Sequence, residues 1–120
     1  MRVLVTGSRG FIGKNLTVRF SEIIGFSTLT FTREDSFSVL SKHVNQSDAI
    51  IHLAGVNRPN NYLEFEAVNV ELTSAICDLI KKTGKKIPLI LASSTQVGLD
   101  NPYGKSKHKA EEIVEKFSVE

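Results

Sequence analysis

One segment constrains the fold of this chain more than any other. In it, three glycines, each separated from the next by two residues, connect a strand pattern to a helix pattern. The run over residues 2–6, RVLVT, is short, apolar and rich in β-branched residues, which is typical of a buried parallel strand. Gly7, Gly10 and Gly13 follow this run, and apolar residues at helical spacing begin at Phe11. A glycine turn that leads from a strand into a helix opens a βα unit. We therefore expect a parallel sheet whose crossovers are helices.

The same alternation of strand and helix is repeated four times along the 120 residues. Further strands are predicted over residues 28–32, 48–54 and 87–92. Helices are predicted over residues 11–24, more weakly over 34–46, from 65 onward, and from 103 onward. Because right-handed crossovers place helices on both faces of a parallel sheet, this order predicts the α/β class. The expected architecture is the amino-terminal part of a Rossmann-type doubly wound sheet, with about four βα units.

The helical spacing also predicts which apolar side chains face the core. In the first helix these are Ile12, Leu16, Phe20 and Ile23 or Ile24. In the second helix they are Phe37, Leu40 and Val44. The only cysteine, Cys77, lies on the apolar face of the third helix, where we expect a buried, reduced thiol.

Composition narrows the class of protein without identifying it. A chain of this length with 41% hydrophobic and 23% charged residues is expected to form one globular domain over residues 1–120. The formal net charge of +2 gives no argument for a nucleic-acid partner. No apolar run reaches the roughly 20 residues of a membrane-spanning helix, and the first residues lack the pattern of a signal peptide. We expect a cytoplasmic protein that contacts neither membrane nor nucleic acid, and we predict no metal site.

The glycine turn is the predicted cofactor site. Gly7 would permit the tight turn, Gly10 would let a pyrophosphate approach the backbone, and Gly13 would allow close packing of helix on strand. The amino terminus of the following helix offers unpaired N–H groups and the positive end of its dipole. The alternative is a plain strand-to-helix turn. The predicted cofactor-binding residues of the turn are Gly7, Ser8, Arg9, Gly10, Phe11, Ile12 and Gly13.

Three motifs together resemble the extended short-chain dehydrogenase/reductase family, also described as the NAD-dependent epimerase/dehydratase family. They are the G-x-x-G-x-x-G spacing of the turn, His52-Leu53-Ala54-Gly55 after the third strand, and Tyr103-Gly104-Lys105-Ser106-Lys107. The resemblance implies that Leu53, Ala54 and Gly55 line a cofactor. By itself, His52 is better explained as a packed strand residue. Asn69 resembles a structural asparagine of the family, although an ordinary helix position explains it nearly as well.

The resemblance also implies a catalytic set of Ser94, Tyr103 and Lys107. Residues four apart on a helix share one face, so Tyr103 and Lys107 are expected to be neighbours. An ammonium beside a phenol stabilises the phenolate and brings the hydroxyl toward the range of general acid and base catalysis. The family implies that Lys107 also hydrogen-bonds the nicotinamide ribose. Of the run at residues 93–95, Ser94 is the predicted residue that orients the substrate oxygen.

The end of the second strand bears on the choice of cofactor. Enzymes of this fold that use NAD place a carboxylate there for the ribose 2′-hydroxyl, whereas this chain has Arg33. Arginine suits a 2′-phosphate, and Arg9 could approach the same group, so we predict NADP(H). NAD(H) stays open as the alternative, because Glu34 and Asp35 follow at once and a small shift of register would restore a carboxylate.

A narrower resemblance comes from the short connection between Ser94 and Tyr103 and from the motif around His52. Both are similar to the reductase domain of CapF-type enzymes of bacterial capsular polysaccharide synthesis. That resemblance implies NADPH-dependent 4-keto reduction of a UDP-linked deoxy-amino sugar, a nucleotide-sugar substrate. The alternatives are a sugar-nucleotide 4-epimerase or dehydratase, or a non-catalytic dinucleotide-binding module. Family members are about twice as long or more, so we expect this chain to end before the substrate-binding region and to form a homodimer or otherwise self-associate.

Overall fold

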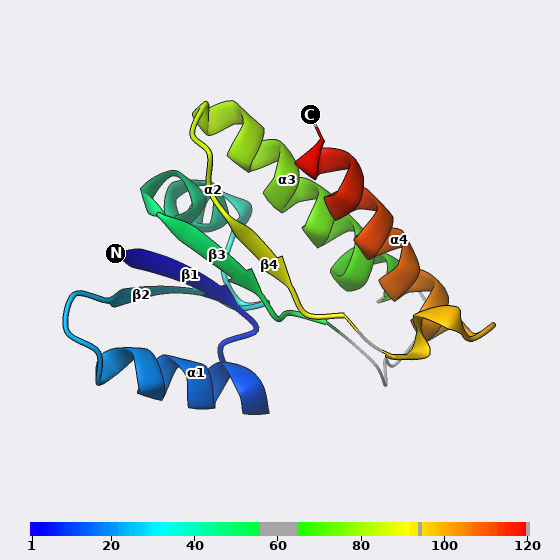
Figure 1. Cartoon of the computed structure of the whole chain (residues 1–120), viewed down its shortest axis with the longest axis horizontal. Helices are drawn as coiled ribbons and strands as arrows, with labels where there is room; N and C mark the ends of the chain where they lie inside the picture. Colours follow the sequence, from blue (N-terminus) through cyan, green and yellow to red (C-terminus); the bar gives the residue numbers. More distant parts are fainter. Residues whose placement is uncertain (56–64, 94, 120) are drawn as a thin grey trace.

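The structure, a computed structural model, describes residues 1–55, 65–93 and 95–119. Within these residues, four strands alternate with four α-helices, and a π-helix precedes α3 (Figure 1). In chain order the elements are β1 (Arg2–Thr6), α1 (Phe11–Ser21), β2 (Ser27–Phe31), α2 (Phe37–Gln46), β3 (Ala49–His52), η1 (Phe65–Glu71), α3 (Leu72–Thr83), β4 (Leu89–Leu91), η2 (Thr95–Gly98) and α4 (Pro102–Ser118). The predicted alternation is confirmed: β1 has the predicted bounds, and the ends of the other three strands differ from the predicted ones by one or two residues.

The four strands form one parallel sheet in the order β2-β1-β3-β4. From β1 the chain crosses to β2 on one side, and from β2 it returns across β1 to β3 and then β4. Because right-handed crossovers in opposite directions lie on opposite faces of a sheet, α1 covers one face, while α2 and α3 cover the other. Figure 1 shows α1 alone below the sheet and α3 with α4 on the opposite side. The predicted doubly wound α/β architecture is therefore confirmed.

The hydrophobic core lies between the sheet and the α2–α3 layer. Its buried members come from three strands, from both of these helices and from the segment before β4: Leu4, Phe31, Leu40, Val44, Ile50, Ile76, Leu79, Ile80 and Ile87. Cys77 is also buried, as predicted. Burial of these side chains stabilises the packing of α2 and α3 on the sheet. It therefore also holds in place the edge of the sheet at which all four strands end.

Two predicted core residues, Ile12 and Phe37, are instead exposed, and so is Ile24, the alternative to Ile23. Ile12 is 61% exposed, because the first turn of α1 packs against the glycine turn through the buried Gly13 and not through Ile12. Phe37 is also 61% exposed, since it is the first residue of α2, directly after the capping residue Ser36. The remaining predicted residues of α2, Leu40 and Val44, are buried. Helical spacing identified the buried residues of α2 after its first turn, but it did not identify which residues are covered where each helix begins.

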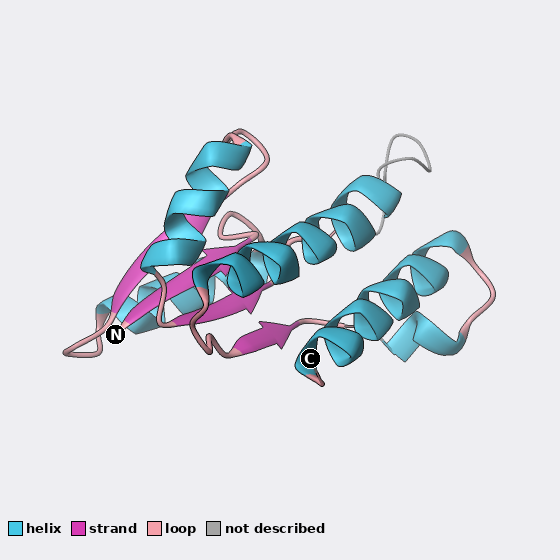
Figure 2. Cartoon of the chain, turned by 90° about the horizontal axis from the view of Figure 1, so that it is seen from above, coloured by secondary structure: helices cyan, strands magenta, loops and turns pink. Residues whose placement is uncertain are grey.

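The two helices that follow β3 and β4 lie side by side and begin at the same end of the molecule. Figures 1 and 2 both show α4 alongside the continuous helix formed by η1 and α3. The helix α4 starts sharply, because the Asn101 side chain accepts a hydrogen bond from the Gly104 N–H at 2.7 Å and Pro102 occupies the first turn. This arrangement brings the first turns of η1 and α4 to the edge where the strands end. In the described residues no helix is long and apolar enough to cross a membrane.

Candidate active site

The glycine turn after β1 is packed so closely that side chains are excluded at two of its three glycines. Gly7 has φ of 70°, and a Cβ there would lie 2.7 Å from the backbone nitrogen of Ala54. A Cβ on Gly13 would collide with the Gly7 carbonyl oxygen and lie 2.8 Å from Cα of Ser8. Gly10 differs, since its Cβ would meet only the Gly7 carbonyl oxygen, at 3.4 Å. Gly7 and Gly13 are therefore required by packing, whereas Gly10 keeps the backbone bare where α1 begins.

In the described part of the chain, no side chain caps the amino terminus of α1. Its N-cap residue is Gly10, which has extended φ and ψ and offers no side-chain acceptor. The N–H groups of the first turn and the positive end of the helix dipole therefore face outward from the turn. This is the environment that a phosphate group of a nucleotide requires.

A cleft of about 480 Å³ lies beside this turn, at the edge where β1, β2 and β3 end. The cleft is lined by residues from four segments, namely the glycine turn, the end of β2, the residues after β3 and the continuous η1–α3 helix: Gly7, Arg9, Gly10, Phe31, Thr32, Arg33, Glu34, Leu53, Ala54, Gly55, Ala67, Val68 and Leu72. Seven of these were predicted as cofactor-binding residues, namely Gly7, Arg9, Gly10, Arg33, Leu53, Ala54 and Gly55. The other predicted residues, Ser8, Phe11, Ile12, Gly13 and Lys107, are not part of the lining. Phe31, Thr32, Ala67, Val68 and Leu72 were missed, because a lining formed by apolar or small side chains has no sequence signal of its own.

One end of the cleft is charged. The Nη1 of Arg9 lies 2.9 Å from Oε1 of Glu34, and both side chains are mostly exposed. Asp35 is engaged locally, because its Oδ2 accepts hydrogen bonds from the Thr32 backbone N–H at 2.8 Å and from the Thr32 hydroxyl at 3.3 Å. Glu34 and Asp35 were the two carboxylates that kept NAD(H) open as the alternative cofactor. Asp35 stabilises the turn after β2, whereas Glu34 lines the cleft together with Arg9 and Arg33.

The predicted catalytic pair lies at the start of α4. Tyr103 is half-buried, whereas Lys107, one turn further on, is buried and donates a hydrogen bond from Nζ to the Ala92 carbonyl oxygen at 2.8 Å. A Cβ on Gly55 would lie 3.5 Å from the Lys107 Nζ, so this ammonium is next to a residue that lines the cleft. Burial lowers the pKa of Lys107 from its ordinary value, and the Glu111 carboxylate on the same helix partly opposes this effect.

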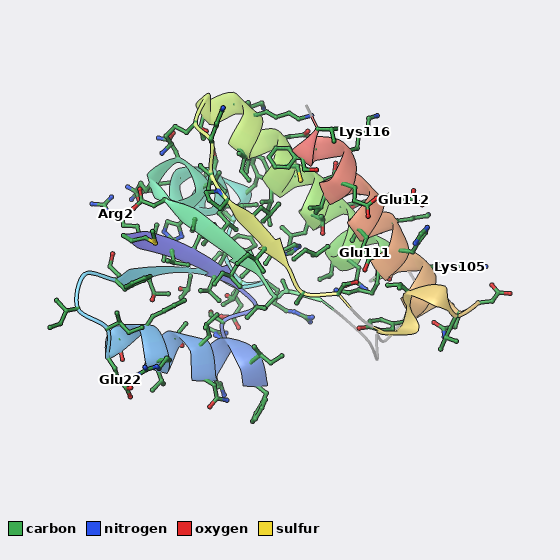
Figure 3. The ribbon with its side chains drawn as sticks, in the orientation of Figure 1. Arg2, Glu22, Lys105, Glu111, Glu112 and Lys116 are labelled. Carbon is green, nitrogen blue, oxygen red and sulfur yellow. The ribbon has the colours of Figure 1, made fainter. Side chains whose placement is uncertain are left out.

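Two adjacent serines follow β4, and the structure describes only the first of them, Ser93. The predicted Ser94 lies outside the described residues. Its neighbour Ser93 donates a hydrogen bond from its hydroxyl to Oε1 of Glu111 at 2.5 Å. Figure 3 shows Glu111 on the side of α4 toward the sheet and Lys105 on its outer side, where Lys105 pairs with Asp100. Ser93 and Glu111 therefore join the end of β4 to α4, one turn beyond Lys107.

Behind the cleft lies a group of buried polar residues that the sequence analysis did not connect. His52 Nδ1 lies 2.6 Å from the Thr6 hydroxyl, and His52 Nε2 lies 2.9 Å from the Thr73 hydroxyl. Asn69 donates a hydrogen bond from Nδ2 to the Ser106 hydroxyl at 2.9 Å. Desolvation, followed by the positive charge of Lys107, lowers the pKa of His52 from 6.5 to about 4, so this imidazole is neutral at neutral pH. A polar residue inside an apolar strand was the one signal that could have pointed to this group.

Comparisons with known proteins agree with this geometry. The profile of the family described as "NAD dependent epimerase/dehydratase family" matches residues 3–120. The chain is 47% identical over 112 residues to a UDP-2-acetamido-2,6-beta-L-arabino-hexul-4-ose reductase of Pseudomonas aeruginosa, covering 93% of this chain and 30% of that protein. The crystal structure of the capsular polysaccharide assembling protein CapF from Staphylococcus aureus matches with a TM-score of 0.84 and 34% identity, over 99% of this chain and 32% of that one.

A more distant structure shows that the fold is shared more widely. UDP-glucuronic acid 4-epimerase from Bacillus cereus, crystallised in complex with NAD, matches with a TM-score of 0.85 at 17% identity, over 99% of this chain and 53% of that one. The chain thus spans about a third of the length of its two more similar relatives and about half of the third.

Proposed function

The chain belongs to the NAD dependent epimerase/dehydratase family, and from this premise we propose that it is the cofactor-binding part of an NADP(H)-dependent sugar-nucleotide oxidoreductase. The proposed reaction is hydride transfer to the 4-keto group of a UDP-linked deoxy-amino sugar, in the synthesis of a capsular or other surface polysaccharide. Residues 1–120 would form the dinucleotide-binding domain, with the sugar bound largely by other parts of the enzyme.

One observation carries the proposal: a single cleft joins the glycine turn to two arginines at one end and approaches the buried lysine at the other. A dinucleotide has the same order of chemical groups, with an adenosine ribose, a central pyrophosphate and a nicotinamide ribose. Gly10 and the first turn of α1 would bind the pyrophosphate. Gly55, beside the Nζ of Lys107, would mark the nicotinamide end.

Preference for the phosphorylated cofactor rests on Arg9 and Arg33. Both line the cleft at the carboxyl end of β2, where the adenosine ribose binds in this fold. Guanidinium groups form strong, paired hydrogen bonds with phosphate oxygens. The Arg9–Glu34 ion pair is mostly exposed and therefore weak, so a 2′-phosphate can compete for Arg9 at small cost.

The proposed chemistry assigns a separate role to each residue of the catalytic set. When bound, the dinucleotide supplies the hydride. Tyr103 donates its phenolic proton to the substrate oxygen in the reductive direction, and the phenolate accepts a proton in the oxidative direction. An ammonium has three N–H donors, and Lys107 uses one of them on the Ala92 carbonyl. Lys107 can therefore also stabilise the phenolate and bind the nicotinamide ribose, while Ser94 orients the substrate oxygen.

The substrate class is supported by the names of the relatives. The Pseudomonas protein is described as a reductase of a UDP-linked 4-ketohexose, and the Staphylococcus protein as a capsular polysaccharide assembling protein. At 47% and 34% identity, both are similar enough for their chemistry to guide the proposal.

Assay of the complete polypeptide that the gene encodes tests this function. We expect NADPH to be consumed in the presence of a UDP-linked 4-keto deoxy-amino sugar, and NMR of the product to show a new hydroxyl at C4. Interconversion of two UDP-sugars without net consumption of NADPH would replace reduction by the epimerase alternative. Binding of the dinucleotide with no turnover of any nucleotide sugar would favour a non-catalytic module.

A further inference from the structure

Three buried polar side chains, those of Thr6, His52 and Thr73, form one continuous row behind the cleft, and Thr73 links this row to the backbone of the buried residue Asn69. Thr6, His52, Thr73 and Asn69 are each 2% exposed or less. The links measure 2.6 Å from the Thr6 hydroxyl to His52, 2.9 Å from His52 to the Thr73 hydroxyl, and 3.0 Å from that hydroxyl to the backbone carbonyl oxygen of Asn69, one turn earlier on the helix. The row begins at the cleft, since the Ala54 backbone N–H donates to the Thr6 hydroxyl at 3.1 Å. Buried polar groups that all have partners define a single arrangement of the elements that carry them.

The direction of every hydrogen bond in the row follows from counting protons. A carbonyl oxygen can only accept, so the single hydroxyl proton of Thr73 goes to Asn69. The Thr73 oxygen must then accept from His52, which places the imidazole proton on Nε2. In a neutral imidazole Nδ1 is then an acceptor, so Thr6 donates to it while accepting from Ala54. His52 is thereby fixed in one tautomer.

The row continues on the far side of Asn69 to the catalytic helix. The Ser106 hydroxyl donates to the Tyr103 carbonyl oxygen at 2.8 Å, so it must accept from the Asn69 Nδ2. This fixes the orientation of the Asn69 amide and directs its Oδ1 toward Gly55, where an added Cβ would lie 3.2 Å from that oxygen. The Lys107 Nζ lies 3.5 Å from the same point. Both ends of the row thus converge on the nicotinamide end of the cleft.

We propose that His52 is a positioning residue: held as its Nε2–H tautomer between Thr6 and Thr73, it couples the cofactor-lining segment at Ala54 to the turn of η1 that carries Asn69 and so to Tyr103. This inference deepens the proposed function and rests on it. Histidine suits this position because its rigid ring carries an acceptor and a donor on opposite sides, so that one side chain can bond Thr6 and Thr73 at the same time. It can join β1 to α3 across the end of β3, which a shorter polar side chain cannot do.

Thr73→Val is the variant that interrupts the row, with Thr73→Ser as the matched variant that keeps the hydroxyl. Ile76→Val is a second control, because Ile76 is fully buried on the same helix and outside the row. The first measurement uses the isotope-labelled chain without cofactor: the ¹⁵N shifts of the His52 ring and the amide resonances of Ala54 and Ser106. The second measures the affinity for NADPH by fluorescence.

We expect the ¹⁵N shifts of the wild-type protein to show that the His52 ring is protonated at Nε2 only. This measurement requires no variant. Thr73→Val should shift the amide resonances of both Ala54 and Ser106 and weaken NADPH binding roughly three- to tenfold, the worth of one buried hydrogen bond. Thr73→Ser should restore both properties, and Ile76→Val should change neither.

Three results would overturn the inference. They are an Nδ1–H tautomer of His52, a Thr73→Val protein whose shifts and affinity match those of Ile76→Val, and a Thr73→Ser protein that behaves like Thr73→Val. Failure of the proposed function is a separate outcome, because a wild-type chain that binds no dinucleotide would refute the cofactor site. The resonance comparison without cofactor would still decide whether His52 couples the two segments.

Discussion

Acidification should destabilise this protein through His52 in a way that can be calculated. The unfolded imidazole has its ordinary pKa of 6.5, whereas burial and the Lys107 charge lower the folded value to about 4. Between these values the unfolded chain binds more protons than the folded one, so stability falls as the pH decreases from about 6.5 toward about 4. At about 1.4 kcal/mol per pH unit, the loss from His52 alone is about 2 kcal/mol between about pH 7.5 and pH 5.

Urea unfolding of the wild type and of His52→Gln at these two pH values isolates this contribution. Glutamine does not titrate, so the variant should lose about 2 kcal/mol less of its unfolding free energy over the same interval. The other two histidines, His43 and His108, are present in both proteins, and their effects cancel in the difference. Equal losses in the two proteins would refute the argument that His52 is buried as a neutral imidazole.

Three further predictions concern the cleft and the catalytic helix. Gly10→Ala should weaken NADPH binding at least about tenfold, measured by fluorescence titration, and should leave the melting temperature unchanged. Gly13→Ala should lower the free energy of unfolding in urea by about 3 kcal/mol or more, because its Cβ collides with the backbone. Tyr103→Phe should abolish hydride transfer, followed by nicotinamide absorbance in the complete polypeptide, while cofactor affinity stays close to wild type. Glu34→Gln should tighten NADPH binding up to about fivefold by releasing its arginine partner, as measured by the same titration.

The glycine variants have a matched control, and the three binding and activity predictions each have a contradicting result. Gly98→Ala is the matched glycine control, since a Cβ there meets nothing within 4 Å and both stability and affinity should be unchanged. Wild-type affinity in Gly10→Ala would remove the glycine turn from the binding site. Retained activity in Tyr103→Phe would refute its role as proton donor. Weaker NADPH binding by Glu34→Gln would show that Glu34 contributes to the site and does not compete with the phosphate.

Much of the fold could be predicted because its determinants are local. The β-branched run of β1, the glycine spacing after it and the helical repeat of α3 each depend on residues within one turn or one strand of each other. The order of these elements then left few topologies, because crossovers are right-handed. For this reason the sequence predicts that Gly7, Arg33 and Gly55 lie at one edge of the sheet, and in the structure they line one cleft there.

The parts that could not be predicted depend on contacts between distant residues. Thr6 and His52 are 46 positions apart, and Thr73 is 21 positions beyond His52, so no periodic pattern connects them. The exposure of Ile12 depends on which residue of the first turn of α1 packs against the glycine turn, and the helical spacing does not encode that contact. Ser94 remains a prediction from the family resemblance.

The cleft between Gly10 and Arg33 is proposed to bind a dinucleotide with a 2′-phosphate. This binding is tested most directly by titrating the chain with NADPH and NADH at the same ionic strength and following the fluorescence of the reduced nicotinamide. We predict that NADPH binds at least about tenfold more tightly, the worth of one charge-assisted hydrogen bond, and that Arg33→Gln removes most of the difference. Tighter binding of NADH, or no binding of either dinucleotide, would contradict the account.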